Sequence, residues 1–255
     1  MAFNYSVQLY AVRTAFQQDP LPTLYRLKKM GYSGVEGFGG FSHTSEDVNN
    51  ALFETGIKLV GYHTPWDYVQ EGKLESTIKY FREIGNKYVI VPALPDECTR
   101  SIDDWKRTAE KFNLISKRLQ NEDMSLGYHN HASEFKPLDG EVPFIVFFDN
   151  TDPSIVMQVD NGHALAGGAD LMEIMRRYPG RARSVHLKPY SKSSGYAPII
   201  GKDDIDWTLF MHWCRDEGGT EHYIVEYEHE EAHPQMEGVE LCINALREME
   251  AAGII

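Results

Sequence analysis

Short apolar segments alternate with longer amphipathic segments eight times along the chain. The apolar segments are rich in Val, Ile, Leu and Tyr and are bounded by Gly, Pro or Asp, as buried parallel strands tend to be. They span residues 3–10, 34–37, 58–62, 88–92, 125–130, 155–160, 183–188 and 222–227. Helical patterns follow them at residues 21–30, 45–54, 74–84, 103–119, 142–148, 171–178, 207–216 and 237–251.

Glycines mark the change from helix to strand. Gly31, Gly56 and Gly85 each follow a helical segment, as expected of left-handed C-terminal caps. This helix–glycine–strand order recurs about every 25–30 residues, which is typical of a repeated βα unit. A doubly wound open sheet would place a glycine-rich turn after the first strand, whereas residues 8–13 contain no glycine. We therefore predict an α/β fold, a single (β/α)8 TIM barrel that forms one domain over residues 1–255.

Length and charge narrow the class of protein. The 255 residues suit one such barrel and are enough for a sizeable core. The net charge is −13, from 38 acidic and 25 basic residues, which disfavours nucleic acid and anionic membranes as partners. No apolar run approaches the roughly 20 residues that span a bilayer.

The sequence favours a reducing compartment. Residues 1–6 lack the basic and apolar regions of a signal peptide, although a signal peptide removed beforehand would leave no trace. Cys98, Cys214 and Cys242 lie far apart without a Cys-x-x-Cys spacing, which argues against a disulfide framework. We therefore expect a cytoplasmic protein.

Residues with metal-binding side chains end the last three strand segments. Asp160, His186 and Glu226 lie at these ends, and the C-terminal strand ends of a parallel barrel meet at one rim, where barrel enzymes carry out their chemistry. A carboxylate in a barrel core is costly unless it is paired or bound to a metal. We predict that these residues bind one divalent metal ion. The structural alternatives are a helix N-cap for Asp160 and an ion pair for Glu226.

The fifth strand segment offers three further candidates, His129, His131 and Glu134, and leaves the fourth metal ligand open. We favour Glu134 because hard divalent ions prefer oxygen. His131 then serves as an acid, a base or a substrate contact, and His129 contacts substrate. Lys188 shares a strand face with His186 and can stabilise an oxyanion, with a structural salt bridge as its alternative role.

Four more residues are candidate substrate contacts near the strand ends: Glu36, His63, Trp66 and His163. An aromatic face such as Trp66 suits the apolar face of a sugar ring, although a packed tryptophan explains it equally well. The sequence contains no P-loop, no Gly-x-Ser-x-Gly motif and no His-Glu-x-x-His motif. The candidates therefore point to metal-assisted chemistry on a small polar molecule.

In their order and spacing, several segments resemble the xylose-isomerase-like barrel superfamily over nearly the whole chain. They are residues 7–13, 34–36, 160–163, 186–188 and 225–227. The resemblance implies a metal held by Glu, Asp, His and Glu from strands five to eight, of which the last three fall on Asp160, His186 and Glu226. The His-Asn-His-x-x-Glu pattern ending at Glu134 resembles an inosose dehydratase-like subgroup. Pro189 departs from the superfamily, where many relatives have Asp.

The resemblance implies a metal-dependent sugar isomerase or epimerase that acts on a ketose or keto-sugar through an enediolate. Glu134 or Glu226 would remove the proton alpha to the carbonyl, the other carboxylate would return it, and Lys188 would stabilise oxyanion charge. Protonation of a leaving group by His131 or His163 would instead give a lyase acting on a keto-inositol or 3-keto-glycoside. We expect Mn²⁺ first, then Mg²⁺, Co²⁺ or Zn²⁺.

Two other kinds of function are alternatives to a sugar isomerase or lyase. A multi-metal endonuclease on the same barrel would need a basic face, which the charge of −13 disfavours. A non-catalytic sugar-binding barrel with an impaired metal site is the second. For the isomerase and for the lyase, we expect a small sugar or polyol as the binding partner. The resemblance to the superfamily also makes a homodimer possible.

Overall fold

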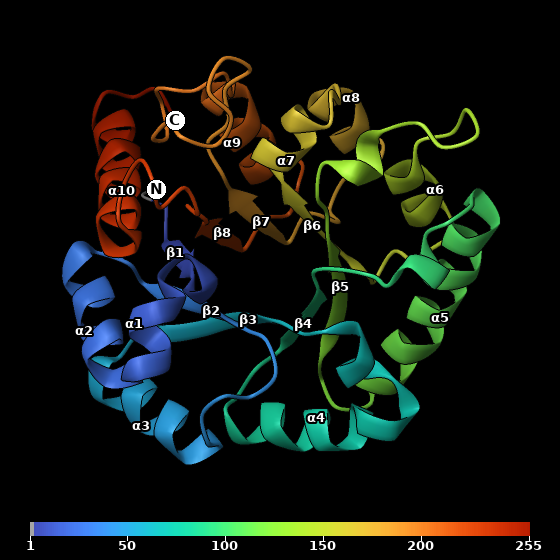
Figure 1. Cartoon of the computed structure of the whole chain (residues 1–255), viewed down its shortest axis with the longest axis horizontal. Helices are drawn as coiled ribbons and strands as arrows, with labels where there is room; N and C mark the ends of the chain where they lie inside the picture. Colours follow the sequence, from blue (N-terminus) through green and yellow to red (C-terminus); the bar gives the residue numbers. More distant parts are fainter. Residues whose placement is uncertain (1–2) are drawn as a thin grey trace.

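Eight parallel strands close into a barrel in the computed structural model, which describes residues 3–255 (Figure 1). The strands are β1 (Tyr5–Gln8), β2 (Gly34–Phe38), β3 (Lys58–His63), β4 (Tyr88–Val91), β5 (Ser125–His129), β6 (Val156–Asp160), β7 (Ser184–Leu187) and β8 (His222–Val225). They follow one another in chain order, and β1 pairs with β8 to close the ring. The predicted (β/α)8 fold is confirmed, with every predicted strand within two residues of its observed start and three of its end.

Helices surround the barrel. They are α1 (Arg13–Gln18), α2 (Pro20–Met30), α3 (Ser45–Thr55), α4 (Glu71–Glu83), α5 (Ile102–Gln120), α6 (Pro143–Asp149), α7 (Asn161–Ala166), α8 (Leu171–Met175), α9 (Trp207–Asp216) and α10 (Gln235–Ala251). Short 3-10 turns lie at η1 (Leu9–Val12), η2 (Trp66–Val69), η3 (Asp96–Cys98) and η4 (Ser133–Phe135). The eight expected helices are present. Helices α1 and α7 were not predicted, because six residues are too few for a helical period to be read.

Side-chain caps and glycines fix the helix ends as the sequence indicates. The Thr44 hydroxyl accepts a hydrogen bond from the Asp47 backbone N–H at the start of α3 (3.1 Å). Gly31 and Gly56 end α2 and α3 with φ of +101° and +62°, a conformation that costs a residue with a Cβ but not glycine. These caps turn each helix back toward the next strand.

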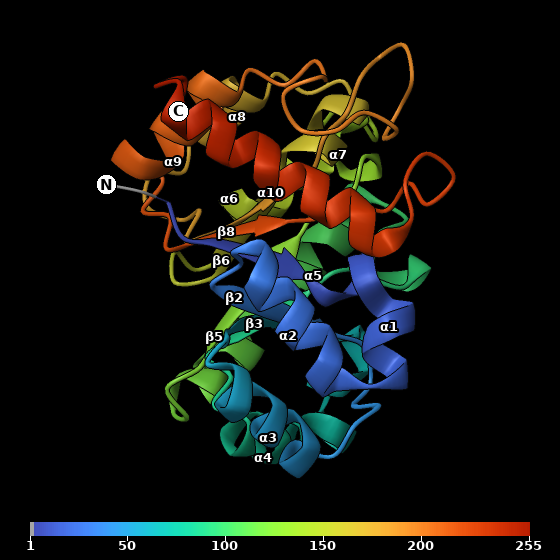
Figure 2. The same cartoon turned by 90° about the vertical axis from the view of Figure 1, so that its left-hand side faces the viewer.

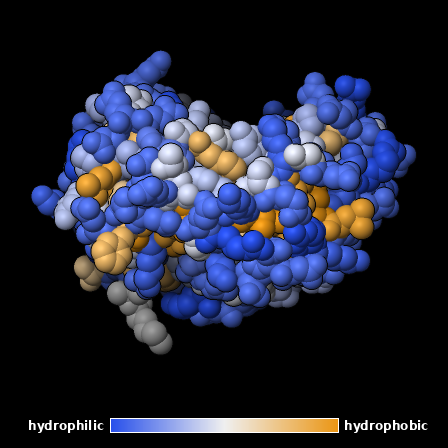
Figure 3. Space-filling model, turned by 90° about the horizontal axis from the view of Figure 1, so that it is seen from below, coloured by the Kyte–Doolittle hydropathy of each residue, from blue (hydrophilic) through white to orange (hydrophobic). Residues whose placement is uncertain are grey.

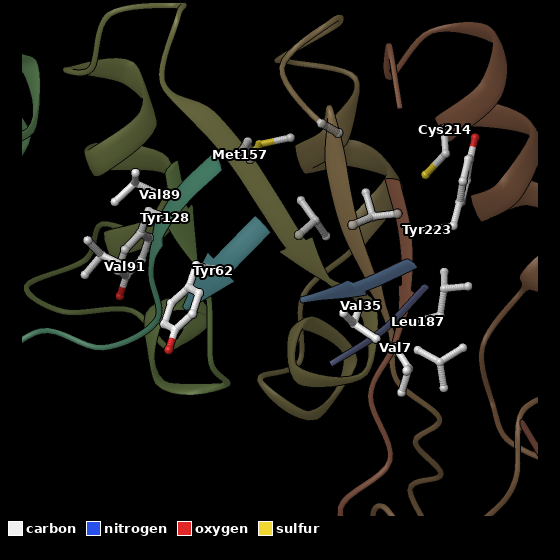
Figure 4. Close-up of a cluster of buried hydrophobic side chains, with 14 of the residues drawn as sticks. Val7, Val35, Tyr62, Val89, Val91, Tyr128, Met157, Leu187, Cys214 and Tyr223 are labelled. Atoms are coloured by element: carbon white, nitrogen blue, oxygen red, sulfur yellow. The ribbon is translucent and has the colours of Figure 1, made fainter. Parts of the chain in front are cut away.

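The hydrophobic core lies between the barrel and its helices. Val7, Val35, Val89 and Leu187 come from four different strands, and each is at most 1% exposed (Figure 4). Each such side chain contributes about 1.5–3 kcal/mol through burial. Alternate side chains of each strand face this layer, which accounts for the apolar positions of the strand segments.

The upper part of the barrel interior is polar. The apolar pattern of the strand segments did not predict this layer. The Gln158 amide nitrogen on β6 donates to Glu36 Oε1 on β2 (2.7 Å), and His63 Nε2 on β3 contacts Gln158 Oε1 (2.7 Å). These strands are not neighbours, so the contacts cross the interior. Gly61 leaves room for them, since a Cβ there would lie 2.9 Å from Glu36 Oε1. The polar layer therefore forms the floor beneath the strand ends.

The outer surface is mainly hydrophilic on the side seen in Figure 3. Helix α10 runs along the outside of the molecule past β1 and α2 (Figure 2). It anchors the first described residue, because the Phe3 N–H donates to Glu250 Oε1 (2.7 Å) and Arg247 donates to the Phe3 carbonyl (3.1 Å). Among residues 3–255, no helix combines the length and the apolar character that crossing a membrane requires.

Candidate functional site

Four side chains with metal-binding atoms meet at the C-terminal ends of β5 to β8. His129, Asp160, His186 and Glu226 bring one candidate ligand atom each to within 4.8 Å of the others. All four are buried, and Asp160 and His186 are fully buried. The structure brings Asp160, His186 and Glu226 together where the sequence placed them, and their role as metal ligands stays a prediction. The strand alignment explains it, since Asp160 pairs with His186 in the sheet and the Glu226 backbone N–H donates to the Leu187 carbonyl (3.2 Å).

His186 lies between two carboxylates. Its Nδ1 is 2.8 Å from Glu226 Oε2, and its Nε2 is 2.7 Å from Glu36 Oε2. Burial alone would lower the pKa of His186, but the charges of Glu226 and Glu36 outweigh burial and raise this pKa to about 10. Glu36 therefore fixes the ring orientation from below and leaves Nδ1 facing the other candidate ligands. A partner that orients a ligand histidine in this way is common in metal sites.

Asp160 serves two purposes with its two oxygens. Its Oδ1 accepts a hydrogen bond from the His163 backbone N–H (2.7 Å) and so caps α7. Its Oδ2 is buried and has no hydrogen-bond partner among the described residues. Burial raises the pKa of Asp160 to about 7, against the opposing charge of Lys188. An orphaned buried carboxylate oxygen inside a cluster of donors fits a cation ligand, because such an oxygen is otherwise costly.

The other two donors also suit a divalent cation. Burial and the neighbouring histidines hold the pKa of His129 well below its usual value, so its ring is neutral. Its Nδ1 faces Gln158 Oε1 (3.1 Å), which places the ring proton there and leaves Nε2 with a free lone pair. For Glu226, burial opposes ionisation, but Lys188 and His186 hold its pKa well below the usual range. Two imidazoles and two carboxylates do not decide among Mn²⁺, Mg²⁺, Co²⁺ and Zn²⁺.

Glu134 does not join this cluster, contrary to our expectation, and His129 occupies the fifth-strand position. The Tyr128 hydroxyl donates to Glu134 Oε1 and the Ser133 hydroxyl to Oε2, both at 2.7 Å. The reason lies in the turn after β5. The Asn130 side chain bonds both the carbonyl and the N–H of Asp160 (3.1 and 3.0 Å), and Glu134 lies further on, in the 3-10 turn η4.

A cavity of about 470 Å³ opens above the cluster, and we call it the mouth cavity. It is lined by Tyr10, Phe38, Gly39, His63, Pro65, Trp66, Pro92, Ala93, His129, His131, His163, Glu226 and Glu228. His131 and His163 lie side by side in its wall, with ring centroids 4.8 Å apart. Burial and the charge of Lys188 lower the pKa of His163 to about 2, so this imidazole is a neutral base.

The remaining predicted residues divide between the cavity wall and the floor. His63 and Trp66 line the mouth cavity, and Trp66 also stacks on Phe112 with centroids 5.4 Å apart. Glu36 does not line it: this carboxylate is fully buried behind His186, so the expected substrate contact is replaced by a contact with that ring.

Lys188 is a buried cation at the edge of the cluster. It lies 3.1 Å from Glu226 Oε2 and also pairs with Glu228. Burial acts against its charge, but Glu226, Asp160 and Glu228 together raise its pKa. Lys188 is thus held as an ammonium group beside the mouth cavity, and both of its predicted roles, ion pairing and oxyanion contact, are available to it.

Sequence reasoning missed three residues of the site. Gln158 and Gln8 hold the Glu36 carboxylate with their amide nitrogens, each at 2.7 Å. A glutamine within an apolar strand segment was the available signal, since a buried amide needs partners. Tyr196 places its hydroxyl 2.8 Å from His163 Nδ1. Tyr196 lies in the loop after β7, and no local pattern marks it.

Comparisons with known proteins agree with this geometry. The sequence profile of the xylose isomerase-like TIM barrel family matches residues 24–249, and the chain belongs to this family. The chain is 29% identical over 195 residues to an inosose dehydratase of Geobacillus kaustophilus, covering 68% of this chain and 62% of that protein. It is 22% identical to an inosose dehydratase of Clostridium perfringens, covering 90% and 93%.

Solved structures show the same fold. A crystal structure described as a sugar phosphate isomerase/epimerase from Parabacteroides distasonis superposes with a TM-score of 0.80 and 25% identity. The superposition covers 95% of this chain and 93% of that one.

Proposed function

We propose that this protein is a divalent-metal-dependent enzyme that removes a proton alpha to the carbonyl of a keto-sugar or keto-polyol. The observation that carries the proposal is the orphaned Asp160 oxygen within a buried set of four donors beneath an open cavity. His129, Asp160, His186 and Glu226 would hold the cation. When bound, such a cation polarises a carbonyl and stabilises the negative charge that develops on its oxygen.

The side chains around the mouth cavity supply the proton chemistry. His163 is neutral at physiological pH, and His131 lies beside it and is partly exposed. A pKa this low makes His163 a weak base, so we assign to it a hydrogen bond with the substrate and assign the acceptance of the alpha proton to the neighbouring His131. Lys188 keeps its charge through its carboxylate neighbours and can stabilise an adjacent oxyanion. Hydrogen bonding of His163 Nδ1 to Tyr196 holds that ring in a fixed orientation.

The fate of the enolate separates two candidate reactions. Epimerisation or isomerisation is supported by the name of the Parabacteroides distasonis neighbour. Elimination is supported by the inosose dehydratase relatives and by one observation of the site. Two imidazoles, His131 and His163, stand together on one wall, while Glu134 is withdrawn. His131 can take the alpha proton and deliver it to the leaving oxygen on the same face, so that the elimination needs no second proton donor.

Proton NMR in D2O tests the proposal. The Mn²⁺-loaded protein is incubated with D-fructose, other ketoses and inososes, and the signal of the alpha proton is followed. Deuterium incorporation with a new stereoisomer supports epimerisation, and loss of water with a new alkene signal supports elimination. The control is Asp160→Asn, which keeps the cap of α7 but removes the orphaned charge. Absence of exchange across the panel in the wild-type protein would refute the proposal.

A further inference from the structure

A separate cavity lies at the base of the barrel, at the end opposite the mouth cavity. Its volume is about 290 Å³, and we call it the base cavity. Ser125 and Val156, the first residues of β5 and β6, line it, and so does Arg183, which directly precedes β7. These are N-terminal strand ends, whereas the proposed metal ligands lie at the C-terminal ends of the same strands. The base cavity therefore has no part in the chemistry proposed above.

Two arginines and no carboxylate line the base cavity. Arg181 and Arg183 contribute the guanidinium groups. Within residues 3–255, neither of them forms an ion pair. Nearby acids such as Asp152 and Glu221 do not line the cavity. Two positive charges gathered at one place in a chain of net charge −13 create a local field that favours an anion.

Arg181 is a fixed positive charge in the wall of the base cavity. It is 9% exposed, and its guanidinium group donates to four neutral acceptors. They are the carbonyl oxygens of Phe148 (2.9 Å), Asp152 (3.1 Å) and Ile155 (3.2 Å) and the hydroxyl of Thr151 (2.8 Å). Because these acceptors carry no full charge, they hold the guanidinium group in place without neutralising it. Arg181 therefore contributes charge to the cavity, while most of its donors are already used.

Arg183 and two serines supply donors that the protein leaves without acceptors. Arg183 Nη2 donates to Ser125 Oγ (2.7 Å), and within residues 3–255 its Nε and Nη1 groups donate to no acceptor. Gln120 Nε2 donates to Ser154 Oγ (2.8 Å). A serine oxygen that accepts a hydrogen bond still has its own O–H to donate, and neither serine gives this bond to another described residue. The free N–H and O–H groups of three residues thus line one cavity, and such groups are the donors that phosphate oxygens accept.

We propose that the base cavity binds a phosphate group, either as inorganic phosphate or as part of a small phosphorylated metabolite. A volume of about 290 Å³ is at the small end of ligand cavities, and it suits such an anion better than a nucleotide. The anion would bridge Arg183 and the two serines and would offset the charge of Arg181. This inference is independent of the proposed function, because it uses neither the metal cluster nor the mouth cavity.

Isothermal titration calorimetry tests this inference with two probes, inorganic phosphate and glycerol 3-phosphate. The protein is kept in EDTA, which removes metal ions that would themselves bind phosphate, and sodium chloride holds the ionic strength constant. We expect saturable binding with one site per chain. Tighter binding of glycerol 3-phosphate would identify a phosphorylated metabolite as the ligand, and tighter binding of inorganic phosphate would identify the free anion.

Two variants locate the bound phosphate. We expect Arg183→Gln to weaken binding about tenfold or more, because it removes a positive charge and the charge-assisted hydrogen bonds. Its matched control is Arg26→Gln, which changes the net charge equally at an exposed position of α2 and should change the affinity less than about twofold.

The second variant, Ser154→Glu, serves in case Arg183→Gln fails to fold. Ser154 is exposed, so the substitution should leave folding intact while it places a carboxylate beside the arginines, and we expect it to abolish binding. Ser76→Glu, at an exposed position of α4, adds the same charge elsewhere and should leave the affinity nearly unchanged.

Three results would overturn the inference. The first is the absence of saturable binding with either probe. The second is binding that survives both Arg183→Gln and Ser154→Glu, which would place the phosphate elsewhere on the molecule. The third is an equal loss of affinity in Arg26→Gln and Ser76→Glu, which would show that binding follows the net charge of the chain and not the base cavity.

Discussion

At the scale of single residues, the site depends on which side chain of the fifth strand faces the cluster. The preference of hard ions for oxygen favoured Glu134, whereas the structure brings His129 to that position. The contacts around β5 are local: Asn130 attaches the end of β5 to the end of β6, and Tyr128 and Ser133 hold the Glu134 carboxylate. Asn161 makes a similar connection, accepting a hydrogen bond from the Lys188 N–H (2.9 Å).

A pair of variants distinguishes the two fifth-strand residues. We expect His129→Ala to weaken Mn²⁺ or Zn²⁺ binding about tenfold or more, because it removes one of four donors, and Glu134→Gln to change the affinity less than twofold. Calorimetric titration of the metal-free protein gives both values. The reverse order of effects would restore Glu134 as the ligand and exclude His129.

At the scale of elements, small residues leave room inside the barrel for side chains of the adjacent strands. A Cβ on Gly127 in β5 would lie 2.5 Å from Ile90 Cδ1 and 2.9 Å from both Val156 Cβ and the Val156 carbonyl oxygen. Two of these neighbours cannot move without moving the backbone of β6. The glycine therefore allows the lower part of the interior to be filled by its neighbours.

Replacement of this glycine should be costly. We expect Gly127→Ala to lower the free energy of unfolding by about 1–3 kcal/mol through overpacking. Gly72→Ala is the matched control, since nothing lies within 4 Å of a Cβ there and the residue is in α4, where alanine is favoured by up to about 1 kcal/mol. Urea unfolding monitored by circular dichroism measures both. Equal midpoints for the two variants would contradict the packing argument.

The loop between β7 and α9 contains an acid with a displaced pKa. Asp203 Oδ1 accepts hydrogen bonds from the Ile205 N–H and the Trp207 indole N–H, both at 2.9 Å. Burial outweighs these bonds and raises the pKa of Asp203 to about 6. The folded state therefore binds this proton more tightly than the unfolded chain, so the favourable contribution is complete below about pH 4 and is lost as the pH rises through about 6.

Substitution of this acid tests the sign of the effect. At pH 8, Asp203→Asn should be more stable than the wild-type protein by about 1 kcal/mol, an amount already reduced for solvent screening of a half-buried group. The difference should shrink as the pH is lowered to 4.5. Urea midpoints at the two pH values provide the test, with Glu110→Gln at an exposed position of α5 as the control. A constant difference between pH 4.5 and pH 8 would show that burial does not raise this pKa.

At the scale of the whole molecule, metal binding and stability should be linked. A cation that binds only the folded chain stabilises it by about 2.7 kcal/mol at a concentration one hundred times its Kd. We therefore expect Mn²⁺ to raise the urea midpoint and EDTA to reverse the rise. Asp160→Asn should remove the effect while leaving the metal-free midpoint nearly unchanged, since asparagine caps α7 equally well. An unchanged wild-type midpoint at saturating Mn²⁺ would argue against the metal site.

The sequence predicts most of the fold. The features that it does not predict depend on turns, on loops and on contacts between distant strands. The strands and longer helices follow from apolar periodicity, and the meeting of Asp160, His186 and Glu226 follows because parallel strands end at one rim. The position of Glu134 depends on a turn, and Tyr196 lies on a long loop. Gln158 acts through partners on opposite strands. The partners of Gln158 come together only when the ring closes, so the sequence marks the residue as unusual but does not identify its partners.

The apolar lower half of the barrel determines from which side small molecules can reach the metal cluster. Tyr88, Ile90 and Val156 form a buried apolar group inside it, and Gln8, Glu36 and Gln158 above them are fully shielded from solvent. The mouth cavity, rather than this lower half, therefore gives reactant and product access to the metal cluster. His131 is partly exposed in this opening, so a proton that its imidazole takes from carbon can exchange with solvent deuterium before it is returned.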